Sequence, residues 1–411
     1  MPVELPTARR DIRAPTPPKA MLWLGVFVLV MLAGIASTLL TWPKDTPTNS
    51  PWFWLRLLVL PALGGCFLFG LRRLHFDQEN ARLRADDEVL AADRAQALKF
   101  AQEPLAVLGA SYLCALGSAD VAAKIIGGAN VLASRDTRSR GSAVRHTALD
   151  VAGFTQQERF DACFEALLRP LIGTLSGIPP RVPLRVYLQL PATVQHAPLF
   201  ELWERRWKTT GLRTFNATLL RPEEGVLALD TWLDARGGPE LEKVALFVAV
   251  QLHDTPPANS AEAGVALLLG WPPLVERQKL TSRGLLHRPV DDANRGLNET
   301  VSNALLWGGA DPAQVQHLWQ AGLVREDQSS LMQATADLAL GFSTDAALDG
   351  IHDIDAAIGH AGVAAAWLAI ALSAEHAQQV RTPLLVASRQ HTFRAMVVRS
   401  QPSAVEAELQ P

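Results

Sequence analysis

The chain has 411 residues, of which 48% are hydrophobic and 19% charged, and its formal net charge is −3. This length allows more than one domain, and the composition allows a substantial buried core. No basic stripe accompanies the slightly acidic balance, which argues against nucleic acid as the main partner. The three cysteines, Cys66, Cys114 and Cys163, show no CxxC or Cys/His ligand spacing, and no phosphate-binding glycine motif occurs. The sequence therefore predicts no metal site and no cofactor.

Two apolar stretches near the N-terminus predict a membrane hairpin. The first, residues 20–42, carries no charge, and a run of that length spans a bilayer as a helix. The second, residues 52–71, has one charge, Arg56, close enough to its start to reach the headgroups. Pro61 predicts a kink that a membrane helix tolerates. A signal peptide is disfavoured by the long apolar run and the long preceding arm.

Charge and aromatic residues predict how this hairpin is oriented. The arm before the first run and the segment after the second are basic, whereas the connecting loop is nearly neutral. Positive flanks stay in the cytoplasm, so both ends are predicted to be cytoplasmic, in a two-pass protein of a bacterial inner membrane. The residues predicted at the membrane interfaces are Trp23, Trp42, Trp52, Trp54, Arg56, Arg72 and Arg73.

Five segments follow from these patterns. They are a cytoplasmic arm (1–19), the transmembrane hairpin (20–72), a helical linker (73–103), a cytoplasmic α/β domain (104–400) and a loose tail (401–411).

Strands and helices are predicted to alternate in the α/β domain, which favours helices covering a sheet. Strands are expected at 104–116, 184–191, 243–252 and 261–270, with a closing pair over 381–390 and 392–400. Helices are expected at 154–175, 198–212, 330–340 and through the alanine-rich stretch after His360. Residues 311–323 begin with an Asp cap and a proline, which predicts another helix.

His360 stands out because a Gly-His pair leads into the alanine-rich run "AGVAAAWLAIAL". A glycine there permits close backbone approach, and a helix N-terminus favours a neutral imidazole that can serve as general base or oxyanion donor. The alternative is a histidine that caps a buried helix. Two polar stretches, "HDID" (352–355) and "HDTPPANS" (253–260), are interpreted as a cap with its turn and as a surface turn, rather than as a metal site and a binding loop.

Three patches in order resemble the thiolase and β-ketoacyl synthase superfamily. They are "IGHAGVAAAWLAIAL", "ANSAEAGVALLLG" (258–270) and "GGADPAQVQHLWQAGL" (308–323). The resemblance spans roughly residues 104–400 and implies a thiolase-like layered α/β fold.

The resemblance does not extend to the catalytic set. The family carries a nucleophilic Cys at a sharp strand-to-helix turn upstream of the "AEAG" patch. Cys163 lies within a predicted helix and Cys114 comes too early. The family's second His is expected in the turn after the "DPAQVQ" segment, where this chain reads "LWQAGL". Only His360 matches, so a catalytically silent fold is predicted.

Trp203 and Trp207 share one predicted helical face, flanked by arginines that include Arg206. Trp and Arg are frequent anchors at interfaces, so these three residues are candidates for partner binding. Core packing of both tryptophans is the alternative.

A membrane region followed by a silent thiolase-like domain resembles the type VI secretion lipase-adaptor family. The resemblance implies a non-catalytic adaptor that binds a lipase-type effector and helps load it onto the secretion spike, with a homodimer as a compatible state. The alternative is a membrane-tethered acyltransferase or condensing enzyme that uses His360 with Cys163 or Cys114.

Overall fold

The chain consists of two compact units, and the computed structural model describes most of both. Residues 4–98 form one unit and residues 99–411 belong to the other. The structure describes residues 16–43, 47–136, 143–213, 216–293, 296–344 and 349–401. Most of the predicted arm (1–15), the centre of the predicted loop (44–46) and nearly all of the predicted tail (402–411) lie outside the described residues.

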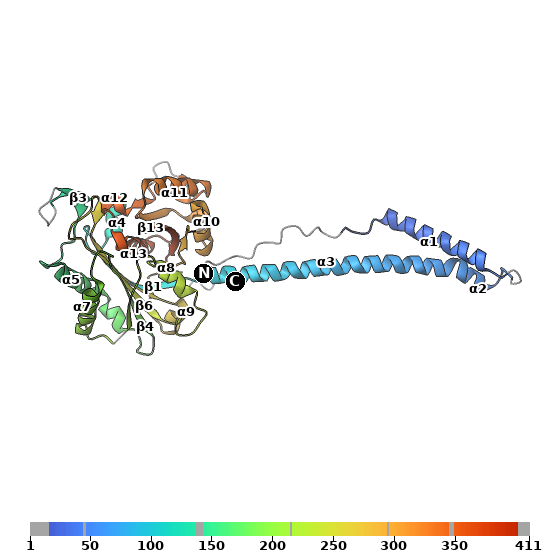
Figure 1. Cartoon of the computed structure of the whole chain (residues 1–411), viewed down its shortest axis with the longest axis horizontal. Helices are drawn as coiled ribbons and strands as arrows, with labels where there is room; N and C mark the ends of the chain where they lie inside the picture. The colour runs from blue at the N-terminus through green and yellow to red at the C-terminus, as the bar shows by residue number, and fades with distance from the viewer. Residues whose placement is uncertain are drawn as a thin grey trace. The chain divides into compact units, whose positions relative to one another are not determined.

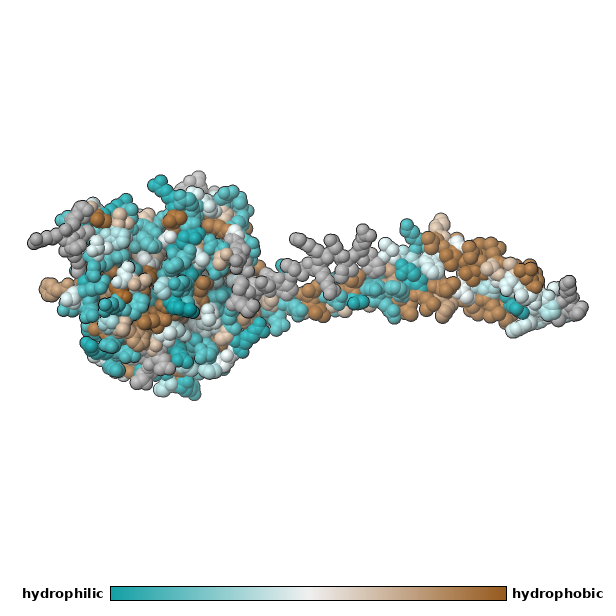
Figure 2. All heavy atoms as spheres, in the orientation of Figure 1, coloured by the Kyte–Doolittle hydropathy of each residue, from teal (hydrophilic) through white to brown (hydrophobic). Residues whose placement is uncertain are grey.

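The first unit is a pair of helices. α1 spans Ala20–Thr41, and the second helix begins as α2 (Pro51–Trp54), continues through the π-helical η1 (Leu55–Val59) and runs on as α3 (Leu60–Ala101). Both helices are long and apolar enough to cross a membrane by length and composition. Figure 2 shows apolar side chains gathered over α1 and the part of the second helix beside it. The second helix is continuous across residue 72, where the predicted hairpin passes into the predicted helical linker.

Glycines bring the two helices into close contact. A Cβ placed on Gly34 would overlap the ring of Pro61, and one placed on Gly65 would lie 2.5 Å from a ring carbon of Phe27. Small residues allow membrane helices to pack closely, so this contact is typical of a specific helix pair. The wide turn of η1 comes directly before Pro61, where a proline removes one helical hydrogen bond.

The predicted interface residues fall at both ends of this hairpin. Trp42 packs edge-on against Phe53, with ring centroids 4.9 Å apart, and Trp52 and Trp54 are exposed near the same loop. Arg56 donates a hydrogen bond of 3.2 Å to the hydroxyl of Thr41. At the other end, the ring of Trp23 packs edge-on against the ring of Phe69. Arg72 is half-buried, and the next residue, Arg73, forms an ion pair with Asp77 at 3.8 Å.

A mixed sheet runs through the second unit and contains two halves with the same strand order. The strands of the first half are β1 (Leu105–Leu113), β4 (Leu184–Gln189), β5 (Asn216–Leu219), β6 (Val244–Gln251) and β8 (Ala263–Gly270). Those of the second half are β9 (Gly284–Leu286), β11 (His317–Ala321), β12 (Ile351–Asp353), β13 (Leu384–Arg389) and β14 (Phe393–Arg399). β10 (Val290–Asp291) pairs with β14, and β2 (Ala133–Arg135), β3 (Val144–Thr147) and β7 (Ser260–Ala261) form a small separate sheet.

Counted within its own half, each set of five lies in the order third, second, fourth, fifth, first. The orientations also repeat: the first and fourth strands are antiparallel to the fifth, and the fourth, second and third are parallel. The first strands of the two halves, β1 and β9, pair antiparallel where the halves join. The domain is therefore an internal structural repeat, which no short-period sequence pattern revealed.

Helices cover both faces of this sheet (Figure 1). Their bounds are α4 (Val121–Ile126), α5 (Gln156–Leu168), α6 (Ile172–Ser176), α7 (His196–Thr209), α8 (Leu227–Leu233), α9 (Pro272–Arg277), α10 (Leu297–Trp307), α11 (Arg325–Asp337), α12 (Ile354–Ile358) and α13 (Ala365–Ala377), with 3-10 turns η2 (Arg169–Leu171), η3 (Pro312–Gln314), η4 (Gly341–Thr344) and η5 (Gly362–Ala364). One core lies under α5 and α7, a second under α10 and α11, and the largest surrounds α13. α13 contacts strands of both halves, and its small alanines let it be buried on nearly every side. This layered α/β fold confirms the predicted fold class.

Most predicted elements are present, and one is wrong. Residues 311–323 were expected to form a helix, and Asp311 does cap a turn by accepting from the backbone N–H of Ala313. That turn is only η3, and the chain then enters β11 between the parallel partners β12 and β13. Pairing on both sides outweighs the local helix-start signal in this segment.

Candidate functional site

A cavity of about 570 Å³ opens where loops of the two halves meet. The first half contributes the loops that follow β4, β5 and β6, and the second contributes the loop before α13 and the β13–β14 turn. These loops follow the carboxyl ends of parallel strands, which is where α/β sheets commonly bind ligands. The lining residues used below are Pro222, Gln251, His253, His360, Gly362 and Gln390.

His360 is held at this cavity by its backbone and by one carboxylate. Its N–H donates to the carbonyl of Asn259 at 2.8 Å, and its own carbonyl accepts from the N–H of Ala261 at 2.8 Å. Its Nδ1 lies 3.5 Å from Asp355 Oδ2, and its side chain is half exposed. The backbone therefore joins this loop of the second half to the 259–261 segment of the first.

Asp355 sets the charge of His360. The hydrogen bond and the negative charge of this carboxylate raise the pKa of the imidazole, and they outweigh the opposing effect of burial. The dipole of a helix N-terminus favours the neutral ring, whereas this nearby carboxylate favours the protonated ring.

The loop before α8 is the counterpart, in the first half, of the His360 loop before α13. Both loops connect the third and fourth strands of their half, and both reach the cavity. The first-half loop runs from Leu220 to Val226 and reads LRPEEGV, with Pro222 facing the cavity. This strand-to-helix turn holds no Cys, Ser or Thr side chain.

Solved ketosynthases share this architecture at low sequence identity. An oxazolomycin ketosynthase domain from Streptomyces albus matches with a TM-score of 0.52 and 13% identity, over 73% of this chain and 96% of that chain. The module 1 ketosynthase of the bacillaene synthase from Bacillus amyloliquefaciens matches with a TM-score of 0.54 and 14% identity, over 74% of each chain. A bacillaene-synthase ketosynthase from Bacillus subtilis gives 0.53 and 12%, over 74% of this chain and 73% of that chain.

The domain has a ketosynthase-like fold. Identity this low establishes the fold and leaves activity open. No protein-family model matches the sequence, and no curated protein matches it either.

Neither thiol of the ketosynthase-like domain reaches the cavity. Cys163 is fully buried within α5 in the core beneath α7, and burial raises the pKa of its thiol to about 12. Cys114 is buried in the central core, and burial raises the pKa of its thiol to about 11. A nucleophilic cysteine needs a lowered pKa and access to substrate, so these thiols resemble structural residues.

The turn predicted to lack the second histidine lies beside His360. In this Ala321–Gly322 turn, the N–H of Gly322 donates to Asp355 at 2.8 Å, and a Cβ on Gly322 would lie 3.3 Å from the Cε1 atom of His360. The turn thus approaches the imidazole with backbone alone, and no second ring is present there.

The proposed partner-binding face is wrong. Trp203 and Trp207 are buried, with Trp203 packed edge-on against Phe164 at 5.2 Å between ring centroids. Arg206 is engaged within the domain, where it bonds to Asp161 and contacts Glu165 at 3.0 Å. The helical spacing of the tryptophans thus marks the buried side of α7, as the core-packing alternative expected.

Most of the cavity residues carry no clear signal in the sequence. The 253–260 stretch is predicted to be a surface turn, yet His253 lines the cavity, and its N–H donates to Glu262. Gln251 contributes its side-chain oxygen, which accepts from the N–H of Val363 at 3.2 Å. A possible signal was the repeated placement of Gln at strand ends, since Gln251 ends β6 and Gln390 follows β13.

Proposed function

We propose that the chain is a non-catalytic, membrane-anchored adaptor whose ketosynthase-like domain binds a partner protein. One observation supports this proposal most strongly: the strand-to-helix turn at the cavity presents Pro222 and contains no Cys, Ser or Thr. His360 lies at the same cavity with Asp355 as its partner, and a histidine without a nucleophile does not transfer an acyl group.

In this proposal the hairpin of α1 and the second helix is the anchor, and the domain lies in the cytoplasm at the bacterial inner membrane. α1 has 22 residues, and at 1.5 Å per residue it is about as long as a bilayer core is thick. We expect a reporter enzyme that works only outside the cytoplasm to be active when it is inserted after Thr48. A reporter that works only inside the cytoplasm should be active when it is fused at the C-terminus. Reporters that locate both positions on the same side of the membrane would contradict the two-pass topology.

We infer the partner class from the resemblance to type VI lipase adaptors. The domain would bind a lipase-type effector and help load it onto the secretion spike. Its contact surface needs exposed anchors other than Trp203 and Trp207. Phe154 is a fully exposed aromatic side chain on the approach to α5, two residues before the cavity residue Gln156. Its own N–H is fixed by Glu158 at 2.8 Å, so the aromatic ring is presented from an ordered backbone.

Affinity capture with the detergent-solubilised full chain, followed by mass spectrometry, tests the adaptor proposal. We expect a lipase-type effector or a spike protein to be captured, and Phe154→Asp to reduce that capture at least about tenfold, as loss of an interface anchor does. His360→Ala is the matched variant and is expected to leave capture unchanged, because the proposed function uses no chemistry. Capture of neither partner class would overturn the proposal.

The ketosynthase-like fold and the cavity with His360 favour one alternative, a membrane-tethered acyltransferase or condensing enzyme. Such an enzyme would form an acyl-thioester on one of its cysteines. Incubation with an acyl-thioester donor and intact-mass measurement tests this directly. A stable acyl adduct that disappears in Cys163→Ala or Cys114→Ala would replace the adaptor proposal.

A further inference from the structure

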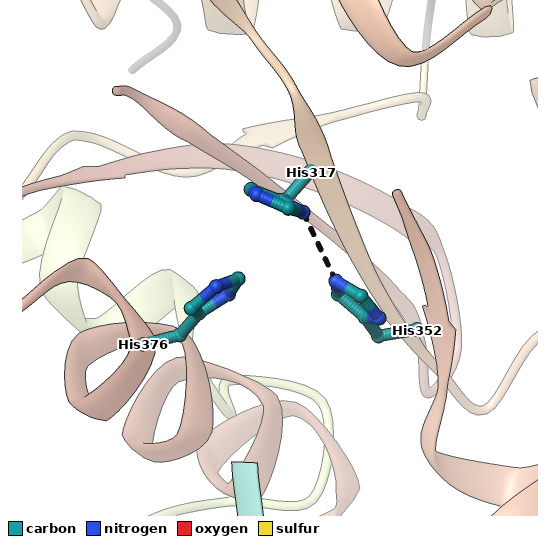
Figure 3. Close-up of side chains that lie close together, drawn as sticks. All are labelled: His317, His352 and His376. Carbon is teal, nitrogen blue, oxygen red and sulfur yellow. Dashed lines mark hydrogen bonds between the residues drawn. The ribbon is translucent and has the colours of Figure 1, made fainter. Parts of the chain in front are cut away.

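We propose that His317, His352 and His376 form a binding site for a divalent transition-metal ion, with Zn²⁺ the best match. The site is separate from the cavity. Its His352 belongs to the "HDID" stretch, which the sequence favours as a cap with its turn rather than as a metal site. Figure 3 shows the three rings facing a common space, two from neighbouring strands and one from a helix. One potential ligand atom from each ring lies within 4.8 Å of the others.

The topology explains why these rings converge. In the parallel pair of β11 and β12, Trp319 is the register partner of His352. His317 precedes Trp319 by two residues, so alternation places both on one face of β11, beside His352. α13 covers β11 and carries His376 in its last turn. Three segments far apart in sequence therefore deliver one histidine each.

The spacing suits tetrahedral coordination. His352 Nε2 lies 3.2 Å from His317 Nδ1. Zn–N bonds of about 2.0–2.1 Å in a tetrahedron put ligand nitrogens roughly 3.3 Å apart. The ligand nitrogen of His376 then has to move toward the other two nitrogens by at most about 1.5 Å. Three imidazoles with a fourth position left for water form a known kind of zinc site.

The position of the group along α13 also suits a cation. His376 lies at the C-terminal end of α13, where the helix dipole favours positive charge. His317 is only half-buried, whereas the other two histidines are buried.

Two hydrogen bonds compete with the metal. The 3.2 Å contact between His352 Nε2 and His317 Nδ1 is one of them, so its proton has to leave before both nitrogens can bind a metal. The other involves Trp319. Trp319 Nε1–H donates to His376 Nδ1 at 3.2 Å, so the neutral ring keeps its own proton on Nε2. A metal on either nitrogen of His376 requires this bond to be released, because Nδ1 then carries either the metal or the proton. Removing the indole N–H should therefore strengthen metal binding.

The test is zinc and cobalt titration of the metal-stripped full chain in detergent, in competition with a chromophoric chelator. We expect one equivalent bound, with the visible absorption of tetrahedral Co²⁺. His317→Gln and His376→Gln should each weaken binding more than about 100-fold, beyond what loss of a second-shell partner causes. The exposed His391→Gln is the matched control and should leave the affinity unchanged.

The Trp319→Phe variant is a second test, because it keeps all three proposed ligands. This variant should bind zinc about fivefold more tightly than the wild type, because it lacks one hydrogen bond that opposes coordination. Absence of stoichiometric binding, or equal binding by the wild type and the His317→Gln variant, would overturn the site. Should His376→Gln fail to fold, the half-buried His317 and the Trp319 variant still decide the question.

Discussion

Replacing Glu262 with Ala is expected to lower the free energy of unfolding by about 3–5 kcal/mol, because it leaves a buried guanidinium without its partner. Arg159 donates to both oxygens of Glu262, at 2.9 and 2.5 Å, and both side chains are almost completely buried. The same carboxylate accepts from the N–H groups of Leu149 and His253. The substitution therefore also removes the support of the cavity loop at His253.

Denaturant unfolding followed by tryptophan fluorescence measures this loss. The matched control is Glu242→Ala, which removes a partly exposed pair with Arg277 at 2.7 Å and should change stability by less than about 1 kcal/mol. Equal effects from the two variants would show that the Arg159–Glu262 pair is not buried in solution.

The same pair predicts a pH dependence. Burial alone would raise the pKa of Glu262, but the bonds from Arg159 and the backbone outweigh it and hold the pKa below the ordinary 4.5. A lowered pKa means that the carboxylate stabilises the fold fully above pH 4.5, and that this contribution is lost as pH falls through the lowered value. Wild-type stability should therefore fall more steeply in acid than that of Glu262→Ala.

Local signals in the sequence were sufficient for most elements. The uninterrupted apolar run of β6 predicts a strand buried on both faces, and Thr155 with Glu158 forms the capping box that starts α5. The Gly-His pair at 359–360 predicted close backbone approach, which the structure confirms. These features depend on neighbours within a few residues, so composition and spacing reveal them.

What the sequence could not show depends on the pairing of distant segments. The buried side of α7 was ambiguous because a Trp stripe suits a core and an interface equally well. The "HDID" stretch was interpreted as a cap with its turn, and Asp353 does cap α12. Its His352 points instead toward His317 and His376, which only the parallel pairing of β11 with β12 and the packing of α13 bring near.

The repeat of the two halves bears directly on the cavity. Corresponding loops before α8 and α13 meet at one cavity, and they carry Pro222 and His360. The repeat therefore brings two corresponding strand-to-helix loops to one cavity with different side chains. A fold shared with ketosynthases does not by itself decide which function such a cavity serves.

Gly359→Ala is expected to destabilise the domain by about 3 kcal/mol, the upper range for a backbone conformation reserved for glycine. Gly359 has φ +100° and ψ 171°, and a Cβ there would lie 2.7 Å from the carbonyl oxygen of Ser260. That oxygen belongs to backbone that is itself held by the His360 bridge, so it cannot move aside without breaking the bond between His360 and Asn259.

Gly211→Ala separates the two causes of this effect. Gly211 has φ +69° but open space around its Cα, so alanine there should cost only about 1 kcal/mol for the left-handed backbone. Chemical denaturation gives both values, and hydrogen exchange at the His360 and Ala261 amides should rise only in Gly359→Ala. Similar losses in both variants, with unchanged exchange at these amides, would mean that the two halves are not joined through this backbone contact. A larger loss in Gly359→Ala would show that the cavity is assembled by main-chain contact between the halves, whatever side chains it presents.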